Sequence, residues 1–249
     1  MNARVCFIGL VLGLALTDST HAQDSATYST LSFGVGLQAI SNNDAFQSLY
    51  TYRGASLAFN STYRSLRTKG HHIIDLTYSD GEIRSIVSPK ADNQLLILNY
   101  DYLFKLKTKR INRRTTSLLG VALHTLLSST NYLPEVESPK SYLSGSAFVV
   151  LGANILYRIN EKNRIRLQSA LPVLGLVYRP DFEINGKTLT AITSVWNSNF
   201  LSIKLEYSYT LTRKLHLRAT YNYNYFTFGE PRRITLLQNA GLIGLVKKF

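Results

Sequence analysis

Apolar and polar side chains alternate along most of this chain, and this alternation is the strongest constraint on its fold. In KLHLRATYNYNYF, residues 214–226, the odd positions are Leu, Ala or Tyr and the even positions are polar apart from Phe226. Successive side chains of a strand point to opposite faces, so the segment predicts a strand with one apolar and one polar face. A soluble sheet buries the apolar face, whereas a membrane barrel turns it to lipid and its polar face to the lumen. The pattern alone leaves both arrangements open.

Ten segments are predicted to be strands on this basis. NQLLILNYDYLFKLK (93–107) and NFLSIKLEYSYTL (199–211) alternate clearly, whereas two others are apolar on both faces and leave strand counts of eight and twelve open. The predicted strands are residues 28–40, 51–65, 71–80, 92–106, 115–127, 142–158, 163–184, 187–211, 214–228 and 232–248.

The connections between these segments also alternate. One set is short and basic: RSLRTKG, KTKRINRR, INEKNR and TLTRK. The other set is mostly longer: SNNDAFQSLY, DGEIRSIVSPKAD, SSTNYLPEVESPKS and a hairpin tip at Asn185-Gly186, a pair that tolerates positive φ. An even number of strands with short turns at one end and long loops at the other predicts an all-β fold, an antiparallel up-and-down transmembrane barrel.

The first 22 residues are expected to be a secretory signal outside this fold. They combine an early Arg4 with an apolar run of 11 residues, CFIGLVLGLAL, and small residues before a cleavage point at Gln23. Residues 23–249 then form a single domain. Cys6 is the only cysteine, so the mature chain is expected to lack disulfides and Cys-ligated metals.

The net charge of +13 raises the possibility of nucleic-acid binding, but the charge is segregated. The larger share of the basic residues lies at the short-turn end, including Arg64, Arg213, Lys247 and Lys248, while most acids lie at the long-loop end. This division indicates a basic rim and an acidic rim, so no nucleic-acid partner is expected.

Aromatic residues gather at two levels of the predicted strands. A ring with a polar tip prefers the boundary between lipid headgroups and acyl chains, so two levels indicate two membrane belts. The inner belt includes Tyr100, Tyr102, Tyr207 and Tyr209, and the outer belt includes Tyr52, Tyr78, Phe200, Tyr223 and Tyr225.

The C-terminal residues GLIGLVKKF end on Phe249, after Ile243 and Leu245 at alternate positions. This end resembles the signal by which outer-membrane barrels are recognised by their assembly machinery, with Lys247 as a departure. The Ala22-Gln23 junction and the Tyr-rich strands resemble exported barrels of the Bacteroidota. The resemblance to bacterial outer-membrane β-barrel proteins implies a Gram-negative outer-membrane location, porin-like architecture, a monomer, and contacts with membrane lipid, lipopolysaccharide and the barrel assembly machinery.

The polar faces of the strands are expected to line the lumen. Ten strands enclose a narrow bore, and buried charges persist when they are paired. These groups therefore predict either a polar plug that holds the barrel's shape or a narrow ion or solute path. The predicted network comprises Asp75, Asn99, Asp101, His124, Arg166, Lys204, Glu206, Arg218, Asn222 and Asn224.

Catalysis is not expected, although a membrane-embedded hydrolase stays as an alternative. Omptin proteases resemble this architecture and carry paired aspartates with an Asp-His couple near the outer rim, where this chain has acids but no histidine. Lipid A deacylases use a His-x-Ser pair, and His124-Thr125-Leu126 lacks the serine. A soluble exported barrel that binds an apolar ligand is a third hypothesis, and it requires the Tyr/Leu faces to point inward.

No cofactor and no metal site are expected. Asp181 and Glu183 point the same way in a strand and could bind a hard cation such as Ca²⁺ or Mg²⁺. An acidic rim bridged to lipopolysaccharide by divalent ions is the simpler interpretation.

Overall fold

The computed structural model describes residues 27–44, 50–67, 70–86, 90–106, 114–131, 141–180, 188–194, 198–229 and 233–249. Within them, every regular element is a strand. The strands are β1 (Tyr28–Asp44), β2 (Tyr52–Leu66), β3 (His71–Arg84), β4 (Ala91–Lys105), β5 (Thr115–Asn131), β6 (Ser141–Arg158), β7 (Asn163–Pro180), β8 (Thr188–Ser194), β9 (Ser198–Thr210), β10 (Leu215–Phe228) and β11 (Ile234–Lys248).

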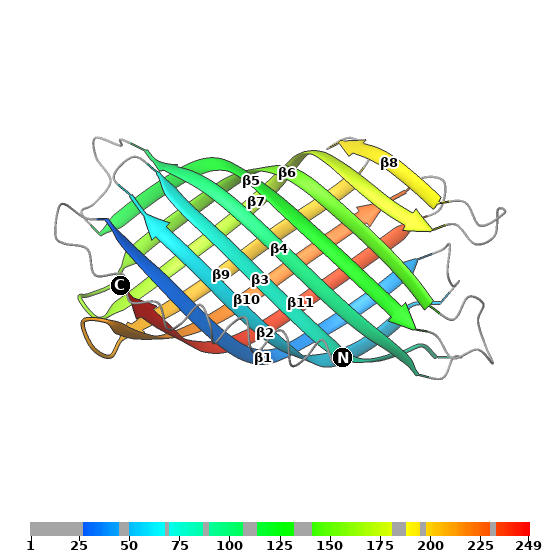
Figure 1. Ribbon diagram of the computed structural model, residues 1–249, viewed down its shortest axis with the longest axis horizontal. Coiled ribbons are helices and arrows are strands. Elements are labelled where there is room, and N and C mark those ends of the chain that lie inside the picture. The colour runs from blue at the N-terminus through cyan, green and yellow to red at the C-terminus, as the bar shows by residue number, and fades with distance from the viewer. Residues whose placement is uncertain are drawn as a thin grey trace.

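These strands close into an antiparallel barrel of ten strands (Figure 1). Each strand pairs with its chain neighbour, except that β8 and β9 both pair with β7 and not with each other. β1 pairs with β11 to close the sheet, from Thr30 opposite Lys248 to Asp44 opposite Ile234. The beginning of β1 and the end of β11 therefore meet at one end of the barrel, which we call the inner end. The predicted all-β, ten-stranded up-and-down topology is confirmed.

The predicted strand over 187–211 is two strands, β8 and β9. Residues 163–170 of β7 pair with β9, and residues 174–180 of β7 pair with β8. Pro172 lies between the two pairings, close to an irregularity of the β6–β7 register at Val149/Val150. Proline has no backbone N–H to donate, which suits the point where β7 exchanges one partner for the other.

Glycine allows the closing strands to approach each other. A Cβ added to Gly36 would lie 1.8 Å from the carbonyl oxygen of Gly241 on β11, a distance that no side chain tolerates. Gly34 is also tight, 3.3 Å from the carbonyl oxygen of Ile243. The GVG segment of β1 thus relieves crowding at the seam.

The exposure of the side chains shows which face of the strands lies on the outside of the barrel. Leu205, Tyr207 and Leu217 are exposed on the outer surface, whereas Glu206 and Arg218, one position away, are buried inside. The hypothesis of an exported barrel with inward Tyr/Leu faces is therefore wrong. An apolar exterior needs an apolar solvent, because soluble proteins rarely expose contiguous apolar patches of this kind.

No helix among the described residues is long and apolar enough to cross a membrane. The predicted signal, residues 1–22, and the Asn185-Gly186 tip lie outside the described residues.

Candidate functional site in the barrel lumen

The centre of the inner half of the lumen is a cluster of buried ions that we call the ionic network: Arg64, Asp75, Lys204, Glu206 and Arg218. Arg64 on β2 donates to both carboxylate oxygens of Glu206 on β9, and the contact from Nη1 to Oε1 is 2.8 Å. Arg218 on β10 adds a second cation 3.7 Å from Glu206. One carboxylate thus joins three strands, and such a fork-to-carboxylate pair fixes direction as well as charge.

Asp75 on β3 is the second acid of the ionic network. Its carboxylate accepts from Lys204 Nζ on β9, from Thr62 Oγ1 at 2.7 Å and from Asn60 Nδ2 at 3.1 Å. Arg218 in turn donates to Asn60 Oδ1 at 2.7 Å and Thr62 Oγ1 at 3.1 Å. The two acids are therefore connected through shared partners, and the network holds β2, β3, β9 and β10 together across the bore.

A smaller group lies beside the ionic network. Asp101 on β4 is 3.1 Å from His124 Nε2 on β5 and accepts from Gln168 Nε2 on β7 at 2.7 Å. Both Asp101 and His124 are buried. Asn99, Asn222 and Asn224 line the same middle region, where the remaining cavity is about 20 Å³. This is room for about one water molecule.

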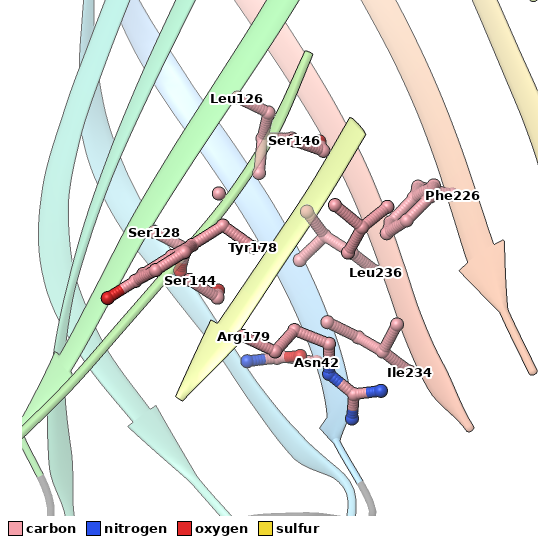
Figure 2. Close-up of a pocket in the computed structure, with 12 residues that line it drawn as sticks. Asn42, Leu126, Ser128, Ser144, Ser146, Tyr178, Arg179, Phe226, Ile234 and Leu236 are labelled. Atoms are coloured by element: carbon pink, nitrogen blue, oxygen red, sulfur yellow. The ribbon is translucent and has the colours of Figure 1, made fainter. Parts of the chain in front are cut away.

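The outer half of the lumen is filled by apolar side chains, which we call the apolar plug. Phe148 stacks on Phe200 with ring centroids 5.0 Å apart and meets Phe226 edge-on at 5.4 Å. The buried residues of the plug include Ile40, Leu95, Ile97, Phe148, Val177, Phe226, Phe228, Ile234 and Leu236. Figure 2 shows Phe226, Ile234 and Leu236 beside Arg179 and Asn42 around a remaining cavity of about 10 Å³.

The apolar plug corrects two sequence predictions. The outer aromatic belt is predicted to include Phe200 and Tyr52, but Phe200 packs against the plug, and Tyr52 is only 1% exposed in a small buried cluster with Ile83 and Ala91 near the outer end. The expectation of a wholly polar bore therefore holds for the inner half, whereas the outer half combines the apolar plug with buried polar groups such as Asn93, Ser128 and Thr130. The sequence carried signals of this filling in Phe226, on an otherwise polar strand face, and in Leu95 and Ile97, on the same face as Asn99.

A wide cavity opens at the inner end of the barrel, and we call it the inner vestibule. Its volume is about 400 Å³, far larger than the two cavities above it. Arg64, Arg166 and Glu206 form part of its lining, so its floor is the ionic network. The lumen thus passes from an open basic mouth to filled middle and outer regions.

The predicted belt tyrosines lie on outward positions of their strands. Tyr100, Tyr102 and Tyr207 are about two-fifths exposed, and Tyr78, Tyr209, Tyr223 and Tyr225 are half-buried between outward neighbours. Polar tips are partnered at the inner level, where Tyr100 Oη lies 2.9 Å from His72 Nδ1 and Tyr207 Oη donates to Asn163.

Phe249 is held at the inner end of the seam. Its backbone N–H donates to the carbonyl oxygen of Ser29 at 2.9 Å, and Lys247 Nζ lies 5.1 Å from its ring centroid. The ring itself is exposed on the outside. Whether it serves as an assembly signal stays a prediction.

Among the described residues, no group of three or more His, Cys, Asp or Glu side chains could hold a metal ion. Asp181 and Glu183, the speculative cation pair, lie outside the described residues. Arg166 of the predicted network lies opposite Glu206 and is 9% exposed, and its Nε has no hydrogen-bond partner, as is also true of Asn99 Oδ1 and Asn222 Oδ1.

No family model matches the chain, and no curated protein sequence matches it either. Solved outer-membrane barrels do match in structure. The outer membrane protease OmpT from Escherichia coli has a TM-score of 0.57 at 8% sequence identity, covering 91% of this chain and 99% of that chain. Neisserial surface protein A has a TM-score of 0.40 at 13% identity (88% and 97% covered), and Ail of Yersinia pestis has 0.39 at 10% identity (89% and 99% covered). The match to OmpT shows that this chain has the fold of the bacterial outer-membrane β-barrels.

Proposed function

We propose that this chain is a monomeric integral protein of a bacterial outer membrane, with a structural or binding role and without an open pore. The single observation that carries the proposal is the reversal of sides: charged and polar groups are buried inside, and Leu, Val and Tyr cover the outside. A lipid bilayer is the solvent that makes this arrangement stable, because only closed barrels and helices satisfy every backbone polar group within it. The fold shared with OmpT supports the same location.

The proposal includes an orientation and partners. The inner end, where β1 begins, β11 ends and the short turns lie, faces the periplasm. The long-loop end faces the lipopolysaccharide. Export by a cleaved signal over residues 1–22, a Gram-negative host of the Bacteroidota type, and recognition of Phe249 by the assembly machinery belong to the same proposal.

A filled lumen favours a binding or structural barrel over a pore. Ions that enter the inner vestibule meet the ionic network and then the apolar plug, and the cavities beyond are about 20 and 10 Å³. Asp101 and His124 form a buried pair, and the third residue that contacts Asp101 is Gln168. Glutamine is not a nucleophile, so this group lacks the third member of a catalytic set. We therefore propose no catalytic role.

The experiment is fractionation of expressing cells, followed by gel mobility with and without boiling and by recording in planar bilayers. The proposal expects the protein in the outer-membrane fraction, a heat-dependent mobility shift, and no steady single-channel current. A soluble periplasmic protein without a shift would contradict the membrane location. A steady current through the folded protein would contradict the closed lumen and favour the narrow path.

A further inference from the structure

The inner vestibule has more positive charge than the protein itself neutralises. Its lining includes the cations Arg64, Arg164, Arg166, Arg213 and Lys248, against the acids Glu161 and Glu206. Glu206 is already engaged by Arg64 and by Arg218 behind it. Five cations in the lining face two acids, so the vestibule has an excess of positive charge and attracts anions.

Arg166 shows that this charge is built into the cavity wall and is not only a property of the rim. It lies on β7 opposite Glu206 of β9, lines the vestibule, and is 9% exposed. Its Nε is buried and has no hydrogen-bond partner. The buried Nε of its neighbour Arg164 is unpartnered as well. Glu206 lies opposite Arg166 and offsets part of its charge, but the same carboxylate is already hydrogen-bonded by Arg64, so Arg166 can still accept an anion from the vestibule.

The size and the chemistry of the vestibule narrow the class of anion. A volume of about 400 Å³ accommodates a small organic ligand, since ligand pockets span roughly 300–1,000 Å³. Guanidinium groups bind phosphate in a bidentate manner, and a phosphate monoester carries close to two negative charges at neutral pH. A single carboxylate would leave most of the excess charge without a partner.

We propose that the inner vestibule is a binding site for a phosphate group, with Arg166 at its base and Arg164, Arg213 and Lys248 around it. This inference rests on the proposed orientation, in which the vestibule opens to the periplasm. The phosphate belongs either to a free phosphorylated small molecule or to the headgroup of a phospholipid.

The test is calorimetric titration of the full barrel, folded in an uncharged detergent, with two probes at moderate salt. Glycerol phosphate represents the free ester, and dihexanoyl phosphatidic acid represents the headgroup. We expect saturable binding with one site per barrel. Equal affinity for both probes assigns the site to free phosphate esters, and clearly tighter binding of the lipid assigns it to headgroups.

Arg166→Gln is expected to weaken binding by about tenfold or more, because it removes a charge-assisted hydrogen-bond donor. Arg84→Gln makes the same change at the outer end of β3, far from the vestibule, where Arg84 pairs with Glu82 at 3.4 Å, and should leave affinity unchanged. Arg213→Gln, on the exposed β9–β10 turn, should weaken binding severalfold, and it decides the matter if the Arg166 variant does not fold.

The inference would be overturned if neither probe bound saturably. It would also be overturned if Arg84→Gln and Arg166→Gln lowered the affinity equally. Neither result touches the membrane location or the closed lumen, which are tested by fractionation, gel mobility and conductance.

Discussion

The inner and outer halves of the lumen are lined by the same strands but filled by different chemistry. In the inner half, Arg64, Glu206 and Arg218 interlock through directed, charged contacts. In the outer half, Phe148, Phe200 and Phe226 pack ring against ring. A buried ion requires a particular partner, whereas an apolar side chain requires only a space of suitable shape and volume. The inner half therefore specifies which strands face each other, and the outer half excludes water.

The largest expected effect is in the ionic network. Glu206→Gln leaves Arg64 and Arg218 buried without their shared acid, and breaking a buried pair in this way costs about 3–5 kcal/mol. We expect this loss in the free energy of unfolding, measured by urea titration of the barrel in lipid vesicles. Glu82→Gln is the matched control at the exposed outer rim, where Glu82 contacts Lys90 at 3.0 Å, and should change little. Equal effects of the two substitutions would show that the ionic network is not a special feature of the inner half.

A somewhat smaller effect is expected in the apolar plug. Phe148→Ala removes the stack on Phe200 and the edge contact to Phe226, and we expect a loss of about 3 kcal/mol, near the low end for a core phenylalanine because Phe200 is itself only partly buried. The same urea titration measures it. Phe59→Ala on the outward face of β2 is the control, since lipid replaces the lost contact there. A greater loss for Phe59→Ala than for Phe148→Ala would contradict the view that the plug stabilises the barrel.

The smallest effect tests whether the two fillings are independent. Glu206 and Phe148 share no hydrogen-bond or ring-stacking partner among the described residues. The free energies of the two substitutions should therefore add in the double variant to within about 0.5 kcal/mol. A coupling energy well above this value would mean that the two halves of the lumen act as one packed unit and not as two separate fillings.

The architecture could be predicted because it depends on a local property. Side-chain direction alternates with every residue of a strand, so the alternation of Leu205, Glu206 and Tyr207 already separates two faces. It also placed ten strands, with short turns at one end. It did not show the break between β8 and β9, since the residues on both sides of the break favour strand equally well.

The contents of the lumen were predictable only where the face was clearly polar. Asp75, Lys204 and Arg218 could be assigned inward on the alternation, and they meet in one network. Phe148 lies in a segment that is apolar on both faces, so nothing in its neighbours distinguishes a plug residue from a lipid-facing one. Phe200 was misplaced because an aromatic ring near a strand end suits either a membrane belt or a filled bore.

The sequence by itself determined the strands, their polar and apolar faces and the segregation of charge, because each of these follows from residues that are close along the chain. Only the tertiary structure decided which face is outside and which residues meet across the bore. Arg64 and Glu206 are 142 residues apart, and barrel closure brings them together. The same closure leaves Arg166 in the wall of the inner vestibule with its Nε unbonded, which no local pattern reveals.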